Sequence, residues 1–108
     1  MRTYRKFAVY LTIYLGDRLP PYYLGSAAVV KLEDGYHGSA TSARWGAIWK
    51  QELRDNPHLF RTYIIPGQYA DTAQEKIDLE LKWQRIFDVV DDEQFVNQAY
   101  ANGGFCST

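Results

Sequence analysis

Glycine and proline residues divide the first two thirds of this chain into short segments, and this punctuation limits the folds open to it. Residues 4–15 are rich in β-branched and aromatic side chains and end at Gly16-Asp17, which predicts a strand followed by a turn. Pro20-Pro21 disfavours helix and predicts an extended segment at residues 22–26. The two strands are expected to form an antiparallel hairpin.

The middle of the chain predicts a loop, a helix and a third strand. Residues 26–40 contain two glycines, which favours a structured loop over a continuous helix. A helix is expected from an N-cap at Thr41 or Ser42 until Asn56-Pro57 ends it. Its apolar side chains recur at helical spacing: Trp45, Ile48, Trp49 and Leu53. Residues 59–65, closed by Pro66-Gly67, predict a strand whose apolar positions suit the centre of a sheet covered on both faces.

The last third of the chain predicts one long helix. Asp71 and Gln74 have the spacing of a capping box, and no glycine or proline interrupts the stretch from Thr72 to about Val90. Its buried stripe is expected at Ala73, Ile77, Leu81 and Phe87. Residues 91–100 show little periodicity, and residues 101–105 are expected to be mobile.

Size and composition indicate one folded domain spanning residues 1–108. Apolar residues make up 46% of the chain and charged residues 23%, which is ordinary for a globular protein and unlike a disordered segment. With the expected elements, this predicts a small α/β domain of the α+β type, in which helices flank a three-stranded antiparallel sheet.

Charge and cysteine content constrain the partners and the compartment. Twelve basic against thirteen acidic residues give a net charge of −1, which argues against tight, autonomous binding of nucleic acid. The single Cys106 forms no internal disulfide, which fits a reducing compartment. No signal peptide or membrane-spanning run is seen, so a cytoplasmic protein is expected. Zinc-ligand spacing, a phosphate-binding P-loop and a Gly-x-Ser-x-Gly nucleophile motif are all missing from the sequence.

Four short motifs occur in order along the chain. They are Ala8-Val9-Tyr10, Tyr23-Leu24-Gly25, Glu80 with Trp83 three residues later, and Phe95-Val96-Asn97-Gln98-Ala99. Their order and the expected elements resemble the catalytic domain of the GIY-YIG nucleases over nearly the whole chain. Residues 31–40, with the sequence Lys-Leu-Glu-Asp-Gly-Tyr-His-Gly-Ser-Ala, resemble a loop of phage homing endonucleases in this family. A phage or mobile-element origin is therefore suspected.

The resemblance implies metal-dependent hydrolysis of DNA. In the family, the tyrosine matching Tyr10 orients or deprotonates the attacking water, and Tyr23 would assist from the neighbouring strand. The matching glutamate, Glu80, would hold Mg²⁺ or Mn²⁺, and Asn97 would border the site and contact substrate. Sequence-specific members usually carry a further DNA-binding domain, so DNA targeting is expected to come from another domain or a protein partner.

The residues themselves leave alternatives open. Glu80 borders the apolar stripe of its expected helix, where a partly buried carboxylate suits either Mg²⁺, which needs few protein ligands, or a salt bridge. Tyr10 in the middle of a strand suits core packing as well as catalysis.

The expected site also needs cationic and proton-transferring side chains. The usual family arginine is not found at its place after the second motif, so Arg44 is the first substitute for holding phosphate and Lys31 the second. Both residues also suit a solvated surface. His37, in the glycine-flanked loop, suits donation to the phosphate or protonation of the leaving 3′ oxygen, and His58 suits a helix cap.

Two further interpretations remain. One is a GIY-YIG-like fold that binds nucleic acid or a protein without cutting. The other is a structural or regulatory phage protein that oligomerises through an aromatic face, for which exposed Trp45, Trp49 and Tyr63 would be the evidence.

Overall fold

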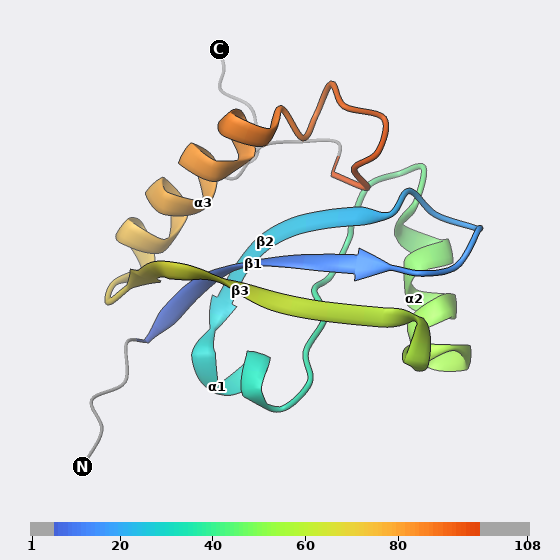
Figure 1. The fold of residues 1–108 in the computed structure, drawn as a ribbon, viewed down its shortest axis with the longest axis horizontal. Coiled ribbons are helices and arrows are strands. Elements are labelled where there is room, and N and C mark those ends of the chain that lie inside the picture. Colours follow the sequence, from blue (N-terminus) through green and yellow to red (C-terminus); the bar gives the residue numbers. More distant parts are fainter. Residues whose placement is uncertain (1–5, 98–108) are drawn as a thin grey trace.

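The computed structural model describes residues 6–97, which form an α+β fold with a three-stranded antiparallel sheet and flanking helices (Figure 1). The elements in chain order are β1 Phe7–Tyr14, β2 Tyr22–Ala28, α1 Val29–Glu33, α2 Gly46–Asp55, the 3₁₀ turn η1 Pro57–Leu59, β3 Phe60–Ala70 and α3 Ala73–Phe87. The predicted fold class is therefore confirmed. The expectations for residues 4–5, 98–105 and Cys106 fall outside the described residues.

The sheet has the strand order β2-β1-β3, so β1 is its central strand. The predicted hairpin is confirmed, because β1 pairs antiparallel with β2 from Phe7↔Ala28 to Ile13↔Tyr22. The prediction of a central third strand is wrong, since β3 lies at an edge. Phe60 and Ile65 of β3 pack against separate core clusters, while Tyr63 is 57% exposed.

β3 continues through Pro66-Gly67, where the sequence predicted that it ends. The ladder with β1 shifts register between Ala8↔Tyr69 and Tyr10↔Ile64, so β3 carries extra residues opposite one residue of β1. Gly67 has a φ of 78°, a conformation that glycine adopts without steric cost. The bulge lies in an edge strand, where a proline does not interrupt the ladder. Pro66 and Gly67 therefore produce a bulge within β3 and do not end the strand.

The region after β2 contains a short helix that was not expected. β2 extends to Ala28, and α1 follows over Val29–Glu33 within the predicted loop. Gly35 and Gly38 come after α1 and have φ values of 95° and 105°. The glycines thus end the helix and shape the following loop, but they do not prevent a single helical turn before them.

α2 and α3 both begin slightly later than predicted. Ser42 accepts a hydrogen bond at Oγ from the Trp45 N–H at 3.1 Å, and the helix α2 proper begins at Gly46. The N-cap of α3 is Thr72, not Asp71, and its hydroxyl accepts from the Glu75 N–H at 3.1 Å. α2 ends before Asn56-Pro57 as predicted.

The buried stripe of α3 differs from the prediction. Ala73 and Phe87 are exposed, whereas Gln84 is buried and Leu79 and Trp83 pack against the core. α3 stops at Phe87 because Asp88 adopts a left-handed conformation with a φ of 55°. The predicted stripe is therefore right in the middle of the helix, where Ile77 and Leu81 are half-buried, and wrong at its two ends.

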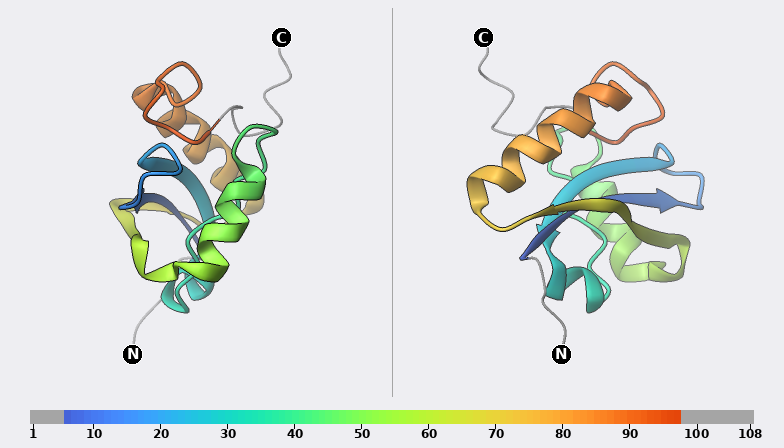
Figure 2. Two further views of the ribbon diagram at one scale, coloured as in Figure 1. Left: turned by 90° about the vertical axis from the view of Figure 1, so that its right-hand side faces the viewer. Right: turned by 60° about the vertical axis from the view of Figure 1, so that its left-hand side comes forward.

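α2 and α3 cover opposite faces of the sheet (Figure 2). On the α2 face, Trp49, Tyr14 and Phe60 belong to one buried cluster. On the α3 face, Val9 and Leu24 pack with Val89 and Phe95 in a second cluster. Side chains of a strand alternate between faces, so Tyr10 and Thr12 point towards α2 and Val9 towards α3. None of the helices within residues 6–97 is long and apolar enough to cross a membrane.

Candidate functional site

Tyr10 is buried in the middle of β1, with 1% of its surface exposed. Its partner on β2 is Gly25, and a Cβ atom at Gly25 would lie 2.7 Å from the Tyr10 hydroxyl. A Cβ atom at Gly38, in the loop above, would also lie 2.7 Å from this hydroxyl. The two glycines therefore make the space that the phenol occupies.

Three tyrosines meet at this point, and we call them the tyrosine cluster: Tyr10, Tyr23 and Tyr36. The ring of Tyr23 lies 6.3 Å from that of Tyr10, centroid to centroid, and the Tyr36 ring lies edge-on at 6.2 Å. The hydroxyl of Tyr36 is 2.8 Å from Ser39 Oγ. The strand β1, the strand β2 and the loop after α1 thus each contribute one phenol.

Glu80 lies on α3, at the opposite face of β2 from the tyrosine cluster. Its carboxylate accepts hydrogen bonds from the Ser26 hydroxyl and, at 2.8 Å, from the Gln84 amide. Ser26 pairs with Val9, so its side chain faces α3, whereas Gly25 next to it lies under the Tyr10 hydroxyl. Carboxylate and phenol therefore approach adjacent residues of one strand from its two sides.

Burial and neighbouring charges tune the protonation of these groups. Burial raises the pKa of Tyr10 well above the ordinary tyrosine value, and the neighbouring phenols and the Glu80 charge add to it. Burial also raises the pKa of Tyr23, with further contributions from Glu80 and Tyr36. Both phenols are consequently protonated at neutral pH and act as hydrogen-bond donors. Burial raises the pKa of Glu80 too, against the lowering effect of Ser26, Lys76 and Gln84.

The two expected cations lie in different surroundings. Lys31 is beside the tyrosine cluster, because its ammonium lies 5.5 Å from the centroid of the Tyr36 ring. Arg44 packs its guanidinium 4.6 Å from the Trp45 ring and lines a separate pocket of about 350 Å³. That pocket is also lined by acidic side chains: Asp91, Asp92 and Glu93. The structure thus brings Lys31, and not Arg44, to the tyrosine cluster.

Asn97 is buried and occupied by backbone contacts. Its side chain accepts from the Leu24 N–H at 3.0 Å and donates to the Leu24 carbonyl at 2.9 Å. The amide therefore pairs with β2 as a neighbouring strand would, which is a structural role. Its predicted contact with substrate stays a prediction.

His37 lies over the pairing of β1 with β3, where it contacts Thr12 and Thr62. Its Nδ1 is 2.7 Å from Thr62 Oγ1, and its carbonyl accepts from the Thr12 hydroxyl at 2.8 Å. Burial, followed by the charge of Arg61, lowers the pKa of His37. His58 is exposed on η1.

Sequence reasoning missed three polar residues here, namely Tyr36, Thr12 and Thr62. Tyr36 stands in the Asp-Gly-Tyr-His-Gly-Ser stretch that was singled out for its resemblance, so its position beside glycines offered a signal. The threonines gave none, because a threonine in a strand is ordinary. Only the register, in which Thr12 is opposite Thr62, reveals their proximity.

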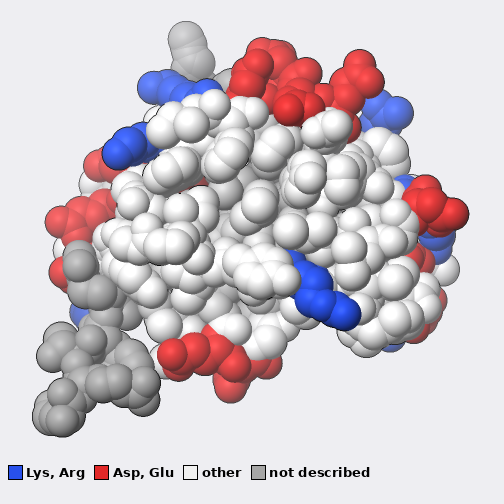
Figure 3. All heavy atoms as spheres, viewed as in Figure 1, with Lys and Arg blue, Asp and Glu red and all other residues white. Residues whose placement is uncertain are grey.

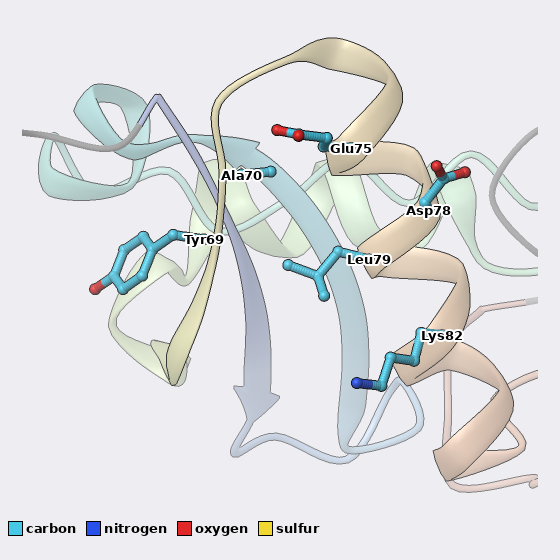
Figure 4. Close-up of a pocket in the computed structure, with 6 residues that line it drawn as sticks. All are labelled: Tyr69, Ala70, Glu75, Asp78, Leu79 and Lys82. Atoms are coloured by element: carbon cyan, nitrogen blue, oxygen red, sulfur yellow. The ribbon is translucent and has the colours of Figure 1, made fainter.

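A second pocket, of about 390 Å³, lies between β3 and α3 and contains none of the expected site residues (Figure 4). Leu79 and Lys82 reach into it from α3. Within residues 6–97, no three histidine, cysteine or acidic side chains are gathered as a metal-ligand set. A metal held by several protein ligands is therefore not supported by this part of the chain.

The aromatic face that would mediate oligomerisation does not form as expected. Trp49 is 1% exposed, and its indole N–H donates to the Gly38 carbonyl at 3.0 Å. Trp45 is half-buried, and Tyr63 is exposed on the far edge strand. Trp49 instead supports the loop that carries Tyr36 and His37.

Comparisons of this chain with models of protein families, with curated proteins and with solved structures gave no match.

Proposed function

We propose that this protein is a metal-dependent endonuclease that hydrolyses phosphodiester bonds of DNA, as its resemblance to the GIY-YIG nucleases implies. The observation that carries the proposal is the meeting of Tyr10 and Tyr23 on neighbouring strands, with the charge of Glu80 acting on both. Two protonated phenols supply hydrogen bonds to a water or a phosphate oxygen. Lys31 adds positive charge at the rim of the same cluster.

The donor set at Glu80 fits Mg²⁺ or Mn²⁺. Each carboxylate oxygen has a second lone pair beyond its bond to Ser26 or Gln84, and Mg²⁺ commonly takes one or two protein carboxylates and completes its shell with water and phosphate. When bound, the ion would supply positive charge for the scissile phosphate. Its binding would also hold Glu80 ionised, against the burial that raises the pKa of this carboxyl.

DNA targeting belongs, in this proposal, to another domain or a protein partner. The net charge is −1, and Figure 3 shows a broad uncharged face with charged side chains mostly around its rim. Neutralising phosphates requires several lysines or arginines together, and this face does not present them. We expect the protein to act in the cytoplasm of a bacterial cell that carries a phage or mobile element.

The test is cleavage of supercoiled plasmid in Mg²⁺ or Mn²⁺, with EDTA as the metal-free control. Glu80→Gln is compared with Asp78→Asn, a matched change at an exposed acidic residue of the same helix. Nicking or linearisation that needs the metal, survives Asp78→Asn and is lost in Glu80→Gln supports the proposal. Equal cleavage by both variants, or none by the wild type at any protein concentration, contradicts it.

A second candidate, a fold that binds nucleic acid or a protein without cutting, is favoured by one observation. Both oxygens of Glu80 are already hydrogen-bonded, and the Tyr10 hydroxyl is enclosed by Gly25 and Gly38. Fluorescence anisotropy with a labelled DNA duplex in EDTA separates the two candidates. Binding without cleavage when Mg²⁺ is restored would favour the second.

A further inference from the structure

Two threonines and a histidine form a closed ring of hydrogen bonds beside the tyrosine cluster. Thr12 on β1 is directly opposite Thr62 on β3, and their hydroxyl oxygens are 2.7 Å apart. The loop after α1 brings His37 over this pair, with its carbonyl 2.8 Å from Thr12 Oγ1 and its Nδ1 2.7 Å from Thr62 Oγ1. Each of the three residues therefore contacts the other two.

The direction of each hydrogen bond in the ring follows from counting protons. A carbonyl only accepts, so Thr12 donates its single hydroxyl proton to the His37 carbonyl. In the contact between the threonines, Thr62 must then be the donor. Having given its proton to Thr12, Thr62 can only accept from His37, so Nδ1 carries a hydrogen.

This arrangement fixes the tautomer of the imidazole. A neutral ring with a hydrogen on Nδ1 has its lone pair on Nε2. Nε2 makes no hydrogen bond to any residue between 6 and 97. Arg61 on β3 is the charged group that acts on the ring, and together with burial it favours the neutral form. His37 thus presents a proton acceptor at neutral pH.

The hydrogen-bonded ring lies on the face of the sheet that carries the tyrosine cluster, whereas Glu80 approaches β2 from the other face. Tyr36 and Gly38, the sequence neighbours of His37, both meet Tyr10, one through its ring and the other at the Tyr10 hydroxyl. Thr12 lies two residues beyond Tyr10 on the same face of β1.

We propose that His37, oriented by Thr12 and Thr62, is the general base of the reaction and accepts the proton of the attacking water at Nε2. The inference rests on the proposed nuclease function and assigns to His37 a role different from donation to the phosphate. The water O–H bond breaks and its proton moves to Nε2, while the oxygen forms a bond to phosphorus. The bond from phosphorus to the 3′ oxygen breaks, this oxygen takes a proton from solvent, and the imidazolium returns its proton to solvent.

The tautomer is tested without any activity measurement. The chain has two histidines, so His58→Gln leaves a single imidazole whose ¹⁵N NMR signals belong to His37. We expect a protonated Nδ1 and an unprotonated Nε2 at neutral pH. Thr62→Val should destroy this preference, whereas Thr62→Ser, which keeps the hydroxyl, should preserve it. A hydrogen on Nε2 in the protein that retains both threonines would contradict the hydrogen-bond directions assigned to Thr12, Thr62 and His37.

The catalytic role is tested by the pH dependence of plasmid cleavage. The cleavage rate should fall in acid as His37 becomes protonated. His37→Gln should cleave about 10²–10⁴-fold more slowly and should no longer show this fall, whereas His58→Gln should keep the wild-type rate and pH profile. Thr62→Val should lower the plateau and move the acid limb to lower pH, because the imidazolium depends on an acceptor at Nδ1; Thr62→Ser should restore both.

The outcomes separate the two proposals. Cleavage by the wild type with an unchanged profile in His37→Gln overturns the base assignment and leaves the nuclease proposal standing. Failure of the wild type to cleave overturns both, while the NMR result still decides whether the threonines orient His37.

Discussion

At the scale of single residues, Glu52 is an acidic side chain buried in the α2 face of the core. Its carboxylate accepts from the Tyr14 hydroxyl at 2.7 Å, from Arg18 at 2.9 Å and from the Asn56 amide at 3.2 Å. The hydrogen bond from Tyr14 is the largest influence that lowers the pKa of Glu52, and Asn56 and Arg18 lower it further. Through Tyr14 and Arg18, these hydrogen bonds connect the hairpin to Glu52 on α2.

The lowered pKa of Glu52 predicts a stability that depends on pH. A carboxyl group with a lower pKa in the folded state stabilises the fold above its unfolded value of about 4.5, and this contribution disappears as the pH falls through the folded value. Glu52→Gln should therefore lower the melting temperature at pH 7, and the difference from wild type should shrink in acid. Thermal unfolding at both pH values measures it, with exposed Glu33→Gln as the control. A difference that is constant with pH would show that the charge of Glu52 contributes nothing.

Gly38 and Gly35 form a matched pair for testing the tyrosine cluster. Both have positive φ, 105° and 95°, so alanine at either position costs roughly 1–2 kcal/mol of backbone strain. A Cβ at Gly38 would also lie 2.7 Å from the Tyr10 hydroxyl and from the Tyr23 ring, whereas a Cβ at Gly35 meets nothing within 4 Å. Denaturant unfolding should show Gly38→Ala to be more destabilising by about 1–3 kcal/mol. Equal losses would mean that the loop does not close over the phenols.

At the scale of elements, the sequence predicted the presence and order of the main strands and helices better than their ends. The β-branched segments and the uninterrupted stretch after residue 71 correctly predicted β1, β2, β3 and α3. The ends depend on local hydrogen bonds with several equivalent candidates, as Asp71 and Thr72 show. Pro66-Gly67 was misinterpreted because the same residues suit a turn or an edge bulge, and only the pairing with β1 decides between them.

The N-cap of α3 provides a prediction at this scale. Thr72 accepts from the Glu75 N–H, and the Glu75 carboxylate accepts in turn from the Asp71 N–H at 3.1 Å. Thr72→Ala should destabilise the protein by about 1 kcal/mol, because an N–H of the first turn loses its acceptor. Urea unfolding checks the value. Thr41→Ala is the comparison, since the sequence offered Thr41 as an N-cap that α2 does not use, and an equal loss there would contradict the assignment.

At the scale of the whole molecule, contacts between distant segments were the part that the sequence did not predict. The segment after α3 showed little periodicity, yet Tyr22 and Phe95 form a parallel bridge and Val96 and Phe95 belong to the two buried clusters. Consecutive residues of this segment point to alternate faces of the sheet beside β2. The segment is too short for this alternation to be recognised in the sequence. Placing Glu80 and Tyr10 on opposite faces of β2 likewise required the register of the sheet.

Asn97 supplies the test of this long-range packing. Its amide joins Leu24 across 73 positions of sequence, so Asn97→Ala leaves a buried N–H and carbonyl without partners and should cost about 1–3 kcal/mol. Asn97→Asp, which keeps an acceptor for the Leu24 N–H but sets a carboxylate oxygen against the Leu24 carbonyl, should also lower the free energy of unfolding. Unchanged stability in both variants, with weakened DNA binding, would instead assign Asn97 to the substrate.

The contact between Trp49 and the loop gives the protein an optical signal. The Tyr23 ring lies 5.1 Å from the Trp49 ring, and the indole N–H of Trp49 holds the Gly38 carbonyl. A molecule that displaces this loop or a phenol changes the polarity around the indole and the energy transfer that it receives from tyrosine. The wavelength and intensity of tryptophan emission would therefore report occupancy of the cluster, without an attached dye and before any bond is cut.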